Sequence, residues 1–159
     1  MAGYGTDEGF ATWAEAAGYD VPEGTVAAAR QRGSVYVDGT YEDRWPGTPT
    51  GGVDQERSWP RTGATDRYGN VIDADTVPAR VISASYEAAL LELQSPGSLS
   101  IVGSNAGRVK RERVEGAVEV EYAASAGSDV VADNRVLSTV IDGILAPLLT
   151  RDMPAVLVV

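Results

Sequence analysis

The chain has 159 residues, with 13 basic and 23 acidic side chains that give a formal net charge of −10. This length suits one domain with a single core, and the acidic balance disfavours nucleic-acid binding, which depends on neutralising phosphates with a basic face. The sequence has no cysteine and no histidine, which excludes disulfides, thiol nucleophiles, the commonest zinc ligands and the usual acid–base side chain.

The first predicted helix follows a few N-terminal residues. Thr6 can cap it, Asp7 and Glu8 suit the positive end of its dipole, and Gly18 favours its end. One face of the helix is apolar, so we expect Trp13 on that face to be a core anchor.

The second predicted helix starts at about Pro22 and runs to about Tyr41. Gly33 weakens this helix but permits another helix to come close. Arg30 and Arg32 are interpreted as solvated surface charge, and ion pairs with a neighbouring subunit are the alternative.

A long connection rich in turn-forming residues follows. Residues 45–52, WPGTPTGG, form a break, and residues 59–75 contain further turn signals. Trp59 is expected to anchor this connection to the helices. Long ordered loops in compact domains tend to carry function, so Arg61 and Arg67 are candidates for contacts with a neighbouring subunit.

The best helix in the sequence begins at Asp75 or Thr76, has Pro78 in its first turn and runs to Leu93. It carries two apolar seams on opposite sides. Such a helix lies in the centre of a bundle, or between a core and a neighbouring subunit. We expect it to be the most buried element, with one seam on the final helix. The seams are Val77, Val81, Ala84, Ala88 and Leu91, and Ile82, Tyr86, Ala89 and Leu93.

Residues 108–122 change to the alternating pattern of a β-hairpin. A three-residue loop sets Arg113 opposite Glu119 and Arg111 opposite Glu121. A two-residue loop would oppose two glutamates, so we favour the first register. The hairpin is expected to project and to contact a neighbouring subunit or another protein, and its four paired residues are candidate inter-subunit contacts.

A final helix is predicted from Asp133 or Asn134 to about residue 149, with a bend at Pro147, which cannot donate a helical hydrogen bond. The segment PAVLVV after it has high β propensity and no charged side chain, so a soluble protein should keep it covered. It either folds back onto its own helices or adds a strand to a partner, and we favour the second interpretation. The candidate partner contacts are Pro154, Val156, Leu157, Val158 and Val159.

The sequence therefore predicts a mainly α fold in a single domain, residues 1–159. A small bundle of about four helices would form the body from residues 6–95 and 133–149, with one inserted β-hairpin at 108–122 and an extended C-terminal tail at 150–159. The expected core anchors are Trp13, Trp59, Val81, Tyr86, Leu91, Ile141 and Leu145.

The sequence contains no phosphate-binding loop, no serine-hydrolase elbow and no metal-ligand motif. The acidic pair Asp73 and Asp75 is explained by helix capping, and Asp66 with Gly69 by a turn. We expect no enzymatic activity, no cofactor and no metal. No stretch approaches the ~20 apolar residues of a membrane span, and the first residues lack signal-peptide features, so a soluble protein made in the cytoplasm is expected.

Four stretches in this order carry a resemblance that covers most of the chain: SWPRTGATDRYGNVID, VPARVISASYEAALLEL, RVKRERVEGAVEVEY and VIDGILAPLL. They resemble the head-to-tail adaptor proteins of tailed bacteriophages. Some sequences of that family are labelled as resembling a single-stranded-DNA-binding primosomal protein, so this function is the alternative.

The resemblance implies a structural virion protein in the phage neck. It would form a ring, typically twelve-fold, that docks beneath the portal and leads to the next neck or tail-completion protein. Genome DNA would pass through the lumen without specific binding, and an acidic lumen would repel its phosphates.

Overall fold

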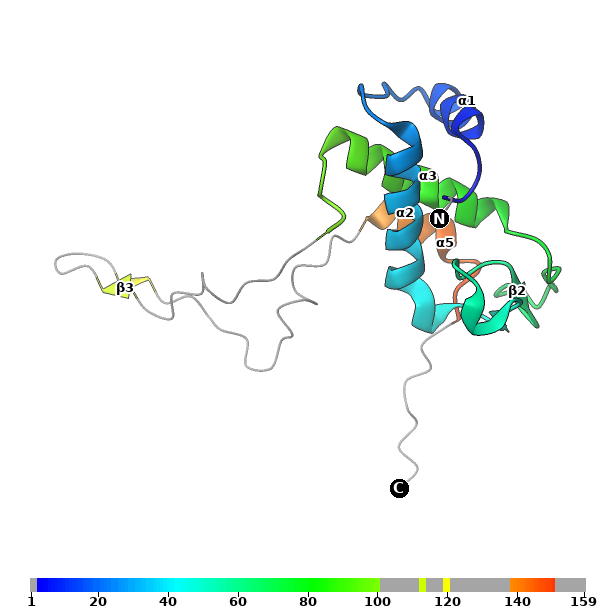
Figure 1. Cartoon of the computed structure of the whole chain (residues 1–159). Helices are drawn as coiled ribbons and strands as arrows, with labels where there is room; N and C mark the ends of the chain where they lie inside the picture. Colours follow the sequence, from blue (N-terminus) through cyan, green and yellow to red (C-terminus); the bar gives the residue numbers. More distant parts are fainter. Residues whose placement is uncertain (1–2, 101–111, 114–118, 121–137, 151–159) are drawn as a thin grey trace. The chain divides into compact units, whose positions relative to one another are not determined.

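The computed structural model describes residues 3–100, 112–113, 119–120 and 138–150 (Figure 1). The chain divides into two units, Met1–Leu99 with Leu137–Val159, and Ser100–Val136. The first unit contains α1 (Asp7–Ala17), α2 (Val26–Tyr41), α3 (Ala79–Gln94) and α5 (Thr139–Leu145). The predicted fold class, a mainly α protein of about four helices with a two-stranded hairpin, is confirmed.

Helix α1 has both predicted ends. The Thr6 hydroxyl accepts a hydrogen bond from the Gly9 amide at 3.0 Å, and Gly18 takes a left-handed conformation with φ 72°. Glycine adopts that conformation without the steric cost of a Cβ atom, so it ends the helix.

Helices α2 and α3 start later than the sequence predicts, and the predicted start of the final helix at Asp133 or Asn134 lies outside the described residues. Helix α2 begins at Val26, after Thr25, and α3 begins at Ala79, with Pro78 at its N-cap instead of in its first turn. Proline excludes the residue before it from helical geometry, which keeps Val77 outside α3. Helix α5 begins after Ser138 and ends at Leu145, so Pro147 follows the helix instead of bending it.

Helix α3 separates two groups of buried side chains. Nine of its 16 residues are buried, compared with six of 16 in α2, so it is the most buried of the described helices. Both predicted seams are used: one packs on α2 and α5, and the other packs on α1 and α2. The first group includes Val37, Val81, Ala84, Ala88, Ile141 and Leu145, and the second Phe10, Ala29, Tyr86, Ala89 and Leu90.

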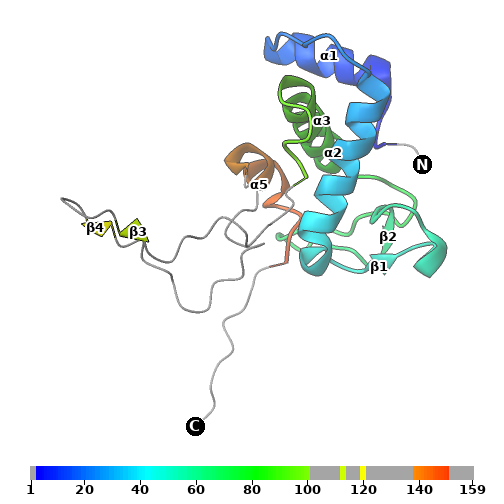
Figure 2. The same cartoon turned by 60° about the vertical axis from the view of Figure 1, so that its left-hand side comes forward.

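Helices α2 and α3 cross in direct contact (Figures 1 and 2). A Cβ atom at Gly33 would lie 2.6 Å from the Ser85 carbonyl oxygen and 2.7 Å from the Ala89 amide nitrogen. Only glycine fits at this crossing, as the sequence suggested.

The connection between α2 and α3 contains two short 3₁₀ helices, η1 (Glu42–Arg44) and η2 (Gly52–Asp54), and a small sheet. Its strands β1 (Thr48–Pro49) and β2 (Arg61–Thr62) are antiparallel. In the second unit, β3 (Glu112–Arg113) and β4 (Glu119–Val120) form the predicted hairpin with Arg113 opposite Glu119. The second predicted pair, Arg111 and Glu121, lies outside the described residues.

Candidate partner-binding surface

The connection between α2 and α3, residues 45–78, is the long loop of the described structure, and one arginine organises its first half. Arg61 is only 4% exposed. Its guanidinium donates to the carbonyl oxygens of Pro46 (2.9 Å), Gly47 (3.0 Å) and Ser58 (3.1 Å) and pairs with Glu42 at 3.2 Å. The donors of Arg61 are thus used inside the chain, and its predicted contact with a neighbouring subunit stays a prediction.

A buried polar junction joins the same loop to α2 and to the N-terminal segment. The Tyr4 hydroxyl donates to Asp38 at 2.6 Å and accepts a hydrogen bond from the Trp59 amide at 3.1 Å. Arg57 pairs with the other Asp38 oxygen at 3.2 Å. Burial raises the pKa of Asp38, and its hydrogen bonds with Tyr4 and Arg57 offset only part of that effect.

Arg30 and Arg32 also form contacts within the chain. Arg30 is 7% exposed; it pairs with Asp7 and donates to the Gly5 carbonyl at 2.6 Å. It is therefore neither solvated nor presented to a partner. The Arg32 side chain is exposed and binds the buried Glu92 carboxylate at 2.7 Å.

The second half of the loop carries a hydrogen-bonded turn at residues 65–71. Asp66 accepts hydrogen bonds from the amides of Tyr68 and Asn70, both at 2.9 Å, and from the Asn70 side chain at 2.8 Å. These donors lower the pKa of the Asp66 carboxyl, the Asn70 side chain most of all. Asp66 therefore has the predicted turn role. Arg67 and Tyr68 project from this turn, and the Arg67 guanidinium lies 5.5 Å from the centre of the Tyr68 ring.

The loop also presents the three most exposed large apolar side chains of the described residues. Val53 is 99% exposed, Val71 78% and Tyr68 72%. The loop around them is fixed by side-chain hydrogen bonds, for example Gln55 to the Pro60 carbonyl at 2.9 Å. Rigid exposed apolar groups, with tyrosine prominent among them, are typical anchors of protein interfaces. Sequence reasoning missed all three, because no periodicity distinguishes them from buried loop residues.

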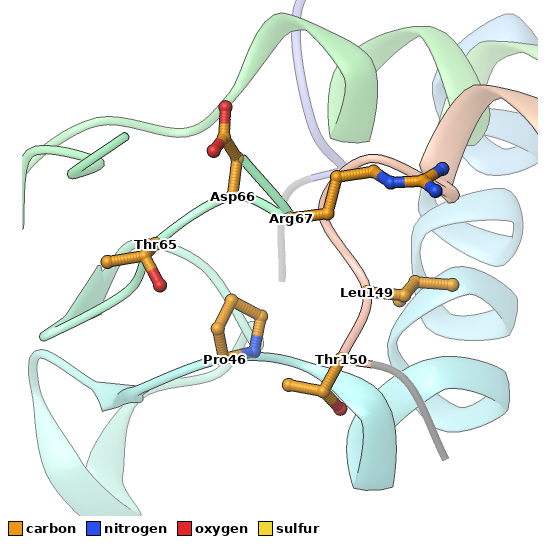
Figure 3. A pocket seen from close by; sticks show the side chains of 6 residues that line it. All are labelled: Pro46, Thr65, Asp66, Arg67, Leu149 and Thr150. Carbon is orange, nitrogen blue, oxygen red and sulfur yellow. The ribbon is translucent and has the colours of Figure 1, made fainter. Parts of the chain in front are cut away.

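A hollow of about 300 Å³ opens beside this turn (Figure 3). It lies where the loop meets the segment that follows α5. The residues around it are Pro46, Thr65, Asp66, Arg67, Leu149 and Thr150.

All three tryptophans lie in the described part of the chain. Trp59 is 1% exposed and Trp45 5%, and their rings meet edge to face at 5.7 Å. Trp13 is partly buried against Phe10 and Tyr86, at 5.8 and 5.9 Å between ring centres.

The remaining predicted site residues fall into three sets: buried core residues, residues at the surface or in the hairpin, and residues outside the described part of the chain. Among the expected core anchors, Val81, Ile141 and Leu145 are 0% exposed, Tyr86 is 5% exposed, and Leu91 is partly buried against the first group. Among the predicted inter-subunit contacts, Arg67 is exposed, and Arg113 and Glu119 are partners in the hairpin register. The predicted partner contacts Pro154, Val156, Leu157, Val158 and Val159 lie outside the described residues.

Within the described ranges, no group of three or more acidic residues could hold a metal ion, and no helix is long and apolar enough to cross a membrane.

Comparison with protein-family models gives a match. Residues 3–159 fit the model of a family described as "Putative DnaT-like ssDNA binding protein". The chain belongs to this family. The match favours the single-stranded-DNA-binding alternative over the head-to-tail adaptor, for which the comparisons give no support. No curated protein and no solved structure matches the chain.

Proposed function

We propose that the protein is a structural subunit of a phage neck, a head-to-tail adaptor that acts through protein contacts. The resemblance of four sequence stretches to such adaptors carries this proposal, and the placement of the tryptophans supports it by opposing the single-stranded-DNA alternative. Proteins that bind single strands stack bases on accessible aromatic rings in a basic groove. Here the Trp45 and Trp59 rings are buried in the core, and Trp13 packs on Phe10.

Charge and exposure also support a role in protein assembly. The net charge of −10 opposes the binding of a polyanion. The long loop presents Val53, Tyr68 and Val71 on a fixed backbone, as an interface with another protein requires.

In the proposed assembly, copies form a ring, twelve-fold by resemblance, between the portal and the next neck protein. The ring would be part of the virion after synthesis in the host cytoplasm. Genome DNA would pass an acidic lumen without adhering to it. A strongly basic lumen in the assembled ring would contradict this part of the proposal.

Single-stranded-DNA binding is the second candidate, and the family description favours it. In the described structure, the best place for a base is the exposed Tyr68 ring, with Arg67 beside it for a phosphate. The Asp66 carboxylate in the same turn makes this position less suitable for a phosphate.

Two measurements on the intact protein separate the candidates. A head-to-tail adaptor should form a stoichiometric complex with the cognate portal in mass measurements, and should leave the anisotropy of a labelled oligonucleotide unchanged at low salt. Saturable oligonucleotide binding that is lost in Tyr68→Ala but retained in Val71→Ala, without a portal complex, would establish the second candidate instead.

A further inference from the structure

The hollow beside the 65–71 turn has an uncharged wall. Figure 3 shows the Asp66 carboxylate and the Arg67 guanidinium directed away from it. The Asp66 oxygens are occupied by hydrogen bonds within the turn. The wall is formed by the side chains of Pro46, Thr65, Leu149 and Thr150 and by the nearby main chain. It is polar and apolar in about equal parts, which suits an uncharged peptide segment with small aliphatic side chains better than an anion.

Hydrogen bonds between different parts of the chain hold this hollow open. The Arg67 amide donates to the Pro147 carbonyl at 2.8 Å. The amide and the hydroxyl of Thr150 both donate to the Arg44 carbonyl, at 2.8 and 3.0 Å. The walls are thus fixed before any ligand arrives, which lowers the entropic cost of binding.

We propose that this hollow receives the aliphatic side chains of residues 154–159 from a second copy of the chain. That segment, PAVLVV, has no charged side chain, and it needs a cover because apolar segments of high β propensity promote aggregation when exposed. An engineered cavity of about 150 Å³ accepts benzene. A hollow of about 300 Å³ therefore has room for about two aliphatic side chains.

The position of Thr150 favours a second copy over the same chain. Thr150 is itself part of the wall, and its two bonds to Arg44 fix the direction in which the chain leaves. Only three residues, 151–153, separate Thr150 from Pro154. The same chain therefore has a short span in which to turn back into the adjacent hollow, whereas the hollow of another copy is accessible.

This contact joins two different surfaces, the segment of one copy and the hollow of the next. Such contacts propagate head to tail, and they close into a ring when the rotation between copies permits. The inference goes beyond the proposed function, because a protein that bound single-stranded DNA could associate in the same way.

Two complementary variants test the contact in the full chain. Thr65→Phe fills the hollow from an exposed position, and Val156→Asp with Leu157→Asp places charge on the segment. In sedimentation velocity, the wild type should gain mass with concentration and each variant alone should remain monomeric. An equimolar mixture should form a one-to-one dimer that grows no further, because it has one intact segment and one open hollow. Thr62→Phe, at another exposed position of the loop, is the matched control and should associate like the wild type.

A labelled peptide of residues 151–159 gives a second readout. It should bind the segment variant saturably, and adding Thr65→Phe should weaken that binding about tenfold or more, as the loss of one buried aliphatic group predicts. If the wild type associates but the equimolar mixture of the two variants stays monomeric, the contact lies elsewhere and the proposal is overturned. A monomeric wild type would also overturn it. If the wild type is monomeric and both variants have a lower melting temperature than the wild type, the hollow binds residues 154–159 of the same chain. If their melting temperatures are unchanged, the segment binds another protein.

Discussion

The α2–α3 pair and the loop of residues 45–78 are both ordered parts of the same unit, but different forces hold them. The helices meet through apolar surfaces and through Gly33, where two backbones touch. The loop has little regular structure, and it is fixed by polar side chains that bind its own carbonyl groups, chiefly Arg61. The comparison shows that a segment with only one 3₁₀ turn and two-residue strands can be held by polar contacts where a helix pair is held by apolar ones. It then depends on single polar residues, because each one satisfies several buried backbone groups.

The largest expected effect comes from removing the organiser of the loop. Arg61→Ala leaves three carbonyl groups without their donor, and we expect a loss of about 3 kcal/mol in the free energy of unfolding. Urea titration followed by tryptophan fluorescence measures this loss, since Trp59 lies in the same loop. The matched control is Arg67→Ala, an exposed position where we expect a change within about 0.5 kcal/mol. Equal effects of the two substitutions would show that the loop is not held in this way.

The helix pair should respond most to one added methyl group. Gly33→Ala places a Cβ atom within 2.6–2.7 Å of the α3 backbone, so the helices must separate. We expect a loss of about 2 kcal/mol by thermal or chemical unfolding. Gly39→Ala in the same helix is the control, because nothing lies within 4 Å of its added Cβ atom; it should stabilise the protein by about 0.5–1 kcal/mol. A stabilising Gly33→Ala would contradict the close approach of α2 and α3.

A smaller effect is expected at the junction between loop and helices. Tyr4→Phe removes the hydroxyl that joins Asp38 to the Trp59 amide, and it leaves both groups with one partner fewer. We expect a loss of about 1–2 kcal/mol. Amide hydrogen exchange provides the specific readout: exchange at Trp59 should accelerate more than exchange in the middle of α3. Uniform acceleration would show that the junction stabilises the whole unit instead of the loop.

The smallest effects are pH-dependent and have opposite signs at two carboxyl groups. Burial raises the pKa of Asp38 above its ordinary value of 3.8, so its contribution to stability is full below that value and is lost as the pH rises through the raised pKa. Burial would also raise the pKa of Glu92. The hydrogen bonds from the Gly97 amide and Arg32 outweigh it, so this pKa lies below 4.5, and the contribution of Glu92 is lost as the pH falls.

Urea unfolding between pH 3 and pH 7 tests these signs. The stability of the wild type relative to Asp38→Asn should decrease as the pH rises, whereas its stability relative to Glu92→Gln should increase. The same slope for both substitutions would refute the assignment of the two environments.

The family match and the buried tryptophans favour different functions, and substitutions in the loop can distinguish between them. The family description favours single-stranded DNA, whereas the packed rings and the acidic charge favour protein partners. Tyr68 and Val71 lie in or beside the same turn, so separate substitutions distinguish base stacking from an apolar protein contact.

The sequence by itself determined the elements whose signals are local. The cap at Thr6, the stop at Gly18, the two seams of α3 and the opposition of Arg113 and Glu119 follow from capping, periodicity and charge pairing between residues close in the chain. Only the tertiary structure decided which arginines are buried and which apolar loop residues are exposed. Arg30 and Arg61 resemble surface charges in the sequence, but they bind carbonyl groups that reach them only when the chain is folded. Val53, Tyr68 and Val71 resemble core residues, but hydrogen bonds within the loop and to the segment after α5 fix the loop with these side chains outward. Burial depends on which distant segments meet, and no local pattern records that.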